Sequence, residues 1–117
     1  MACAAGLAAL DLLQKENLVQ SVAEVAPHFE NALHGLKGTK NIIDIRNFGL
    51  IGAVELAPRE GAPGARGYDA FNRAFHDQNL MVRCTGDVLA LSPPLILQKE
   101  HIDRIFDRLA ATIRATA

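Results

Sequence analysis

The stretch Ile42-Ile43-Asp44-Ile45-Arg46-Asn47-Phe48-Gly49-Leu50-Ile51-Gly52-Ala53-Val54-Glu55-Leu56 decides the fold of this chain. β-Branched and polar residues are mixed over 42–46, as on a half-buried strand, and a second apolar run follows over 50–56. Asn47 and Gly49, which lie between the two runs, both tolerate a positive φ, so a tight connection is favoured. The pattern predicts a β-hairpin over residues 41–56.

The segment before the hairpin is predicted to be helical. Residues 1–36 are rich in Ala, Leu, Gln, Glu and Val, and apolar residues recur every three or four positions. Asn17 and Pro27 interrupt the pattern. Because proline removes a backbone donor and clashes with the preceding turn, we expect a kink or break near Pro27. Gly35 and Gly38 are expected to end the helix.

The residues after the hairpin alternate between loop and regular structure. Prolines and glycines are frequent from 57 to 67, which predicts a loop. Beyond it we expect a helix over 68–79, two short strands within 80–91 and an amphipathic C-terminal helix over 98–115. The two strands are placed at 80–83 and 88–91, around the turn Thr85-Gly86-Asp87.

These elements predict a single α+β domain that spans residues 1–117. Antiparallel strands covered by helices form a two-layer domain. A chain of 117 residues is long enough for one core but too short for two large domains.

The composition excludes several classes of protein. Half of the residues are hydrophobic and the formal net charge is −1, which is typical of a folded domain and not of a disordered chain. With a pI near 6.4, we expect no nucleic-acid partner and no membrane partner. Two distant cysteines, Cys3 and Cys84, indicate reduced thiols in a cytoplasmic protein and not a disulfide framework.

No catalytic or metal-binding constellation is evident. Ser21 and Ser92 lack the glycine neighbours of a nucleophile elbow. The four histidines have no metal-ligand spacing and are interpreted as solvated helix residues; they are His28, His34, His76 and His101. We therefore assign no catalytic residue and no metal ligand.

Two carboxylates of the hairpin leave an alternative open. Asp44 and Glu55 lie on opposite strands, where they could face each other as an acid/base pair. The other interpretation is a structural or exposed role.

Arg83 is the residue whose position most suggests chemistry. It follows the apolar run Leu80-Met81-Val82 and precedes a glycine turn. A guanidinium at a strand end can bind a planar carboxylate through two parallel hydrogen bonds. The competing interpretation is a salt bridge to Asp87 or simple exposure.

Three segments form an ordered set that carries a family resemblance. They are Ala2-Cys3-Ala4-Ala5-Gly6-Leu7-Ala8-Ala9-Leu10, then Arg46-Asn47-Phe48-Gly49-Leu50-Ile51-Gly52-Ala53-Val54-Glu55, then Leu80-Met81-Val82-Arg83-Cys84-Thr85-Gly86-Asp87 with Leu91-Ser92-Pro93-Pro94-Leu95. Together they resemble the C-terminal small domain of class III pyridoxal-phosphate-dependent aminotransferases, a domain of fold-type I enzymes. The third segment is most similar to the ω-amino acid:pyruvate (β-alanine:pyruvate) branch. Asn47 stands where the family usually has glycine.

The resemblance implies a role for two arginines. In that branch, an arginine at the position of Arg83 binds the carboxylate of the substrate and is thought to swing aside for an apolar group. Arg46 is interpreted as structural, holding the hairpin or a neighbouring carboxylate.

The resemblance also implies partners outside this chain. The full-length enzyme would be a homodimer that uses pyridoxal phosphate and acts on an amino acid and a keto acid. Its cofactor would be held by a large domain that is absent here. The lysines Lys15, Lys37, Lys40 and Lys99 lie in polar contexts, so we expect no cofactor-binding residue on this chain and no turnover by it alone. The amino donor and the oligomeric state of the isolated chain are left open.

Two other interpretations compete with this one. The chain could be a free-standing α+β module that binds a small carboxylate through Arg83, or a fragment that folds without activity.

Overall fold

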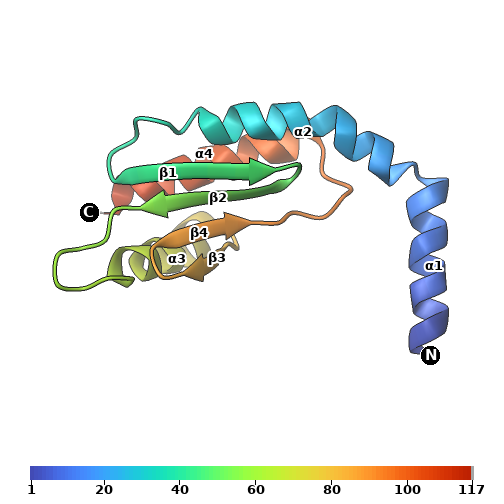
Figure 1. Cartoon of the computed structure of the whole chain (residues 1–117), viewed down its shortest axis with the longest axis horizontal. Coiled ribbons are helices and arrows are strands. Elements are labelled where there is room, and N and C mark those ends of the chain that lie inside the picture. Colours follow the sequence, from blue (N-terminus) through green and yellow to red (C-terminus); the bar gives the residue numbers. More distant parts are fainter. Residues whose placement is uncertain (117) are drawn as a thin grey trace.

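A computed structural model describes residues 1–116 as two packed layers with one projecting helix (Figure 1). The elements, in chain order, are α1 (Ala2–Lys15), α2 (Leu18–His34), β1 (Ile42–Phe48), β2 (Ile51–Leu56), α3 (Ala65–Gln78), β3 (Arg83–Thr85), β4 (Val88–Leu91) and α4 (Lys99–Ala115). This arrangement confirms the α+β class.

The four strands form one antiparallel sheet in the order β1-β2-β4-β3. Helices α2, α3 and α4 cover one of its faces, and the alternate residues of β2 and β4 that face them are buried. The core is apolar, and its centre includes Phe29 and Phe106, whose rings meet edge-on with centroids 5.1 Å apart. Such an edge-to-face pair adds to the burial of both rings.

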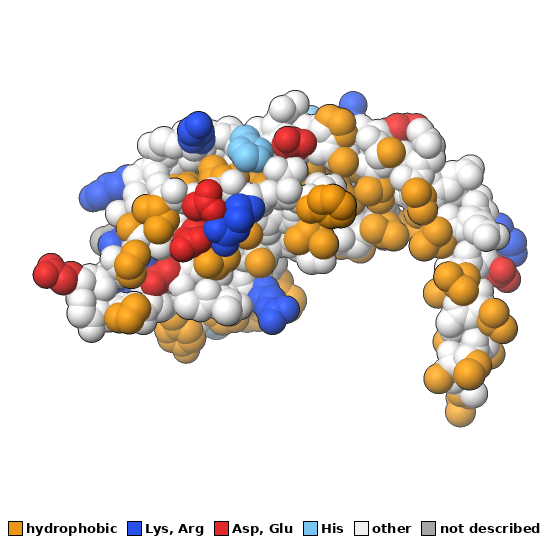
Figure 2. Space-filling view, in the orientation of Figure 1, with side chains coloured by type: hydrophobic (Ala, Val, Ile, Leu, Met, Phe, Trp, Pro, Cys, Tyr) orange, Lys and Arg blue, Asp and Glu red, His pale blue; other side chains and the backbone are white. Residues whose placement is uncertain are grey.

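The opposite face of the sheet carries no helix. Cross-strand pairing places Arg46, Ala53, Ala90 and Arg83 in one row across all four strands. Figure 2 views this face and shows hydrophobic side chains around a cluster of acidic and basic ones. One of the exposed hydrophobic residues is Phe48, at the end of β1. An apolar surface of this kind is typical of a contact face.

The break in the N-terminal helical segment falls at Asn17 and not near Pro27. Asn17 has a left-handed backbone with φ of 49°, and α2 begins after it. Pro27 lies inside α2. It is tolerated because both Pro27 and Ala23 are exposed, so water can reach the carbonyl that the missing N–H leaves without a helical partner.

The strand expected over 80–83 is also misplaced. Residues 80–82 have no regular structure, and β3 begins only at Arg83. Asn79 ends α3 in a left-handed conformation, and the Leu80 N–H donates back to the Ala74 carbonyl at 2.8 Å. Leu80 and Val82 therefore enter the core as a coil and not as part of the sheet.

The hairpin turns at Gly49 and Leu50, and Asn47 lies within β1. Gly49 supplies the positive φ of the turn, at 56°. Asn47 is extended and uses its side chain instead, since its Oδ1 lies 2.8 Å from Nε2 of His34. Among the described residues, no helix is long and apolar enough to cross a membrane.

Candidate functional site

Arg83 is the first residue of β3 and lies beside an open groove of about 640 Å³. It pairs with Ala90 of β4, so the two residues share the uncovered face of the sheet. The groove is mainly apolar and lies at the start of β3 and the end of β4, beside residues of α2 and α4; Phe29, Ile51, Met81, Pro93, Pro94 and Ile105 are among its lining residues. The guanidinium of Arg83 thus lies at the edge of an apolar groove.

The guanidinium of Arg83 is available for a ligand. Arg83 is exposed, and within residues 1–116 its side chain makes no hydrogen bond or ion pair. The salt bridge to Asp87 considered above does not form, because the Asp87 carboxylate binds the backbone N–H groups of Gly64 and Gly67. Arg83 keeps its full set of donors for an external carboxylate.

Arg46 has the structural role expected of it. Its Nη1 donates to Asp44 on its own strand and to Glu55 on β2, the latter at 2.8 Å. The hydrogen bond to Glu55, followed by that to Asp44, raises the pKa of Arg46 above its ordinary value. Asp44 and Glu55 are paired across the hairpin. Both carboxylates are therefore occupied by one cation, which favours the structural interpretation over an acid/base pair.

The histidines are distributed over separate contacts and do not converge. Nε2 of His28 lies 2.6 Å from Asp103, and His101 closes the N-terminus of α4 with Gln98. His34 contacts Asn47, and His76 stands edge-on to Phe75. No group of histidines, cysteines and carboxylates in residues 1–116 could hold a metal ion.

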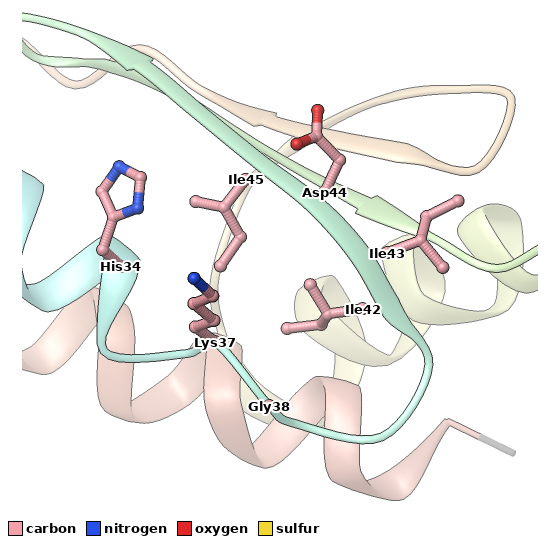
Figure 3. Close-up of a pocket in the computed structure, with 7 residues that line it drawn as sticks. All are labelled: His34, Lys37, Gly38, Ile42, Ile43, Asp44 and Ile45. Carbon is pink, nitrogen blue, oxygen red and sulfur yellow. The ribbon is translucent and has the colours of Figure 1, made fainter.

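A second groove, of about 480 Å³, lies between the end of α2 and the edge strand β1 (Figure 3). Lys37 and His34 reach toward it from one side and Ile45 from the other. The carboxylate of Asp44 points away from the lysine and is bound by Arg46. The groove therefore lacks the converging polar groups that fix a small ligand.

Sequence reasoning missed two polar clusters around α3. Asp69 binds Arg59 at 2.8 Å and Arg73 at 3.0 Å. The hydrogen bond from Arg59, aided by that from Arg73, lowers the pKa of Asp69 although partial burial opposes it. The other cluster is the attachment of Asp87 to Gly64 and Gly67. The only sign of this attachment in the sequence was the presence of glycine just before α3 and in its first turn.

The comparison with protein families identifies the class of protein. Residues 1–113 match the model of the family described as aminotransferase class-III. The chain belongs to this family, which confirms the resemblance drawn from the three segments.

Individual relatives show which branch of the family the chain resembles most. The chain is 56% identical over 113 residues to an omega-amino acid–pyruvate aminotransferase of Pseudomonas putida, covering 97% of the chain and 25% of the relative. It is 50% identical over its whole length to a beta-alanine–pyruvate aminotransferase of Pseudomonas aeruginosa, covering 26% of that protein. The crystal structure of a thermostable omega transaminase variant from Pseudomonas jessenii superposes with a TM-score of 0.85 at 30% identity, covering 92% of this chain and 25% of that one. The chain therefore spans about a quarter of the length of the relatives it matches.

Proposed function

We propose that this chain is the small C-terminal domain of a cytoplasmic ω-amino acid:pyruvate aminotransferase. The enzyme would move an amino group from a donor such as β-alanine to a keto acid. The relatives named for these reactions support the branch. In this proposal Arg83 binds the substrate carboxylate, and the observation that carries it is an unpaired guanidinium beside an apolar groove.

The side chain of Arg83 suits an enzyme that binds substrates with a carboxylate and substrates without one. A guanidinium binds a carboxylate through two parallel N–H groups, and its long apolar stem allows the head to move aside when an apolar group arrives. The groove offers apolar walls formed by Ile51, Met81 and Pro93. A donor without a carboxylate could use these walls and leave Arg83 in solvent.

The cofactor of the family does not fit the residues of this chain. One related structure is an omega transaminase in complex with PMP, which supports our proposal that the full-length enzyme uses pyridoxal phosphate. All four lysines here are exposed: Lys15, Lys37, Lys40 and Lys99. A lysine that binds this cofactor covalently is typically activated as a nucleophile by an apolar pocket or by a neighbouring cation, so we assign cofactor binding to residues outside this chain.

The uncovered sheet face and α1 support a partner domain. No residue of α1 is buried, and Phe48 and Ile51 are exposed on the sheet. We propose that a large cofactor-binding domain covers these surfaces and that the complete enzyme is a homodimer. Arg83 shares the sheet face with Ile51, so this docking would bring it to the domain boundary, where active sites commonly form.

The test uses a chimera in which this chain replaces the matching quarter of the P. putida relative. The donor half-reaction is followed in single turnovers without keto acid, once with β-alanine and once with a primary amine that has no carboxylate. We expect Arg83→Ala to weaken β-alanine binding by about 10- to 100-fold, the effect of losing a charge-assisted pair. Amine binding should hardly change.

Arg83→Lys is the matched control, because it keeps the charge without the two-pronged geometry. It should recover only part of the β-alanine binding. An equal loss for both donors after Arg83→Ala would contradict the assigned role. If the isolated chain itself bound β-alanine at sub-millimolar concentration, the free-standing carboxylate-binding module would be the better interpretation.

A further inference from the structure

The carboxylate of Asp87 joins two parts of the molecule that are distant in sequence. Its Oδ2 accepts a hydrogen bond from the N–H of Gly64 at 2.6 Å, and its Oδ1 accepts one from Gly67 at 2.8 Å. Asp87 lies in the turn between β3 and β4, whereas Gly64 is the N-cap of α3 and Gly67 is in its first turn. A negative charge is favoured at the N-terminus of a helix, and both hydrogen bonds are charge-assisted.

The backbones of the turn and the helix are in direct contact at the same place. A Cβ atom on Gly67 would lie 2.2 Å from the carbonyl oxygen of Gly86, so only glycine allows this approach. The carbonyl of Asp87 also accepts the N–H of Leu56, at 2.9 Å. The turn is thus attached to α3 by its side chain and to β2 by its backbone.

The strand that carries Arg83 depends on this turn for its position. β3 has only three residues and pairs with β4 alone. The residues before it, 80–82, form no regular structure. Arg83 lies three residues before Gly86, the first residue of the turn, so a shift of the turn would displace the backbone from which the guanidinium extends.

The same two hydrogen bonds keep the Asp87 carboxylate from pairing with Arg83. Both of its oxygens are engaged by backbone N–H groups. A carboxylate four residues from Arg83 and free to rotate would compete with the substrate for the same donors. The attachment to α3 removes that competitor.

We propose that Asp87 is a positioning residue for Arg83: it anchors the β3–β4 turn on the first turn of α3 and leaves the guanidinium open to a substrate carboxylate. The inference rests on the proposed role of Arg83. It assigns a specificity effect to a residue that does not itself touch the substrate.

The experiment measures Asp87→Asn in the chimeric enzyme with both donors. The amide keeps one acceptor oxygen but loses the charge and one hydrogen bond. We expect binding of β-alanine to weaken about tenfold, the lower end of the loss expected when the charge-assisted pair with Arg83 is removed altogether, with binding of the carboxylate-free amine unchanged. Asp107→Asn is the control, because Asp107 is exposed on α4 and makes no hydrogen bond or ion pair within residues 1–116.

A second readout does not depend on catalysis. In the 117-residue chain, amide hydrogen exchange at Gly67 should accelerate in Asp87→Asn and stay unchanged in Asp107→Asn, since the carboxylate is the acceptor of that N–H.

The outcomes separate the two proposals. If Arg83→Ala fails to discriminate between the donors, the proposed role of Arg83 is wrong. If it discriminates and Asp87→Asn does not, the positioning role alone is wrong. An equal loss for both donors in Asp87→Asn would show a purely structural role. The double variant with Arg83→Ala should bind β-alanine no worse than Arg83→Ala alone, because both changes act through one group.

Discussion

Leu33 of α2 lies directly over Gly52 of β2, so closely that a Cβ atom on Gly52 would be 2.8 Å from Cδ2 of the leucine. Phe29 lies one turn earlier on α2, and its Cε1 would be 3.0 Å from the same added Cβ atom of Gly52. Both side chains are fully buried. The absence of a side chain at Gly52 therefore sets the distance between the helix layer and the sheet.

Gly52→Ala should destabilise the fold. The added methyl group would push against two core side chains, and overpacking of this kind costs about 1–3 kcal/mol. Urea unfolding of the 117-residue chain measures the change. Gly6→Ala is the control, since a Cβ there meets nothing within 4 Å. If the two variants unfolded at the same urea concentration as the parent, the close packing would be wrong.

The parts of the fold that could be predicted are those with local patterns. The hairpin and α4 each carry their own signal, a glycine turn between apolar runs in one case and helical periodicity in the other. The start of β3 could not be predicted, because Leu80 and Val82 look like strand residues but are buried against helices. Their place depends on contacts made far along the chain.

The candidate site also has one part that could be predicted from the sequence and one part that could not. Arg83 was identified from its residue type, its neighbours and the family resemblance. The partner of Asp87 was not, because the hydrogen bond to Gly67 spans 20 residues. From the sequence, Arg83 itself was the nearest cation and the obvious partner. The N-terminus of α3 competes better for the carboxylate because two aligned N–H groups face it.

Asp69 makes a pH-dependent contribution to stability. Its pKa is lowered by Arg59 and, second to that, by Arg73. A carboxylate whose folded pKa is below its unfolded value stabilises the fold above the ordinary pKa of 3.8. That stabilisation is lost as the pH falls through the folded pKa.

We therefore expect Asp69→Asn to be less stable than the parent near neutral pH and to approach it in acid, as the pH falls below 3.8 and through the lowered pKa of Asp69. Urea unfolding over this pH range measures the difference. Asp77→Asn is the control, because it removes an exposed carboxylate of the same helix that takes no part in the ion pairs with Arg59 and Arg73. A difference for Asp69→Asn that stayed constant into acid would mean that ionisation is not its source.

The two cysteines should differ in reactivity. Burial raises the pKa of the Cys84 thiol, with a smaller contribution from the charge of Asp87, and its Sγ lies 3.3 Å from the Gly86 carbonyl. Cys3 is exposed on α1. Since the thiolate is the nucleophile, iodoacetamide at about pH 8 should alkylate Cys3 first, as followed by mass spectrometry. In urea the two rates should converge. Faster alkylation of Cys84 in the folded chain would contradict its burial.

Helix α1 projects from the body of the molecule (Figures 1 and 2) and exposes an apolar surface. Leu7, Leu10 and Leu12 are 65%, 61% and 52% exposed. Apolar groups on neighbouring turns are seldom left in water. In the absence of a covering domain, we expect the isolated chain to self-associate through this helix, with a sedimentation coefficient that rises with protein concentration.

Replacing Leu7 and Leu10 by Gln should suppress this association without lowering the stability of the fold. The reason is that α1 contributes no buried residue, so its side chains add nothing to the core that unfolds cooperatively. Replacing Leu33 and Leu109 by Gln should instead lower the stability of the fold, because both are fully buried and the amides would be left in an apolar core. Concentration-dependent sedimentation that persisted in the Leu7/Leu10 variant would place the contact on another surface, and the exposed sheet face with Phe48 would then be the next region to substitute.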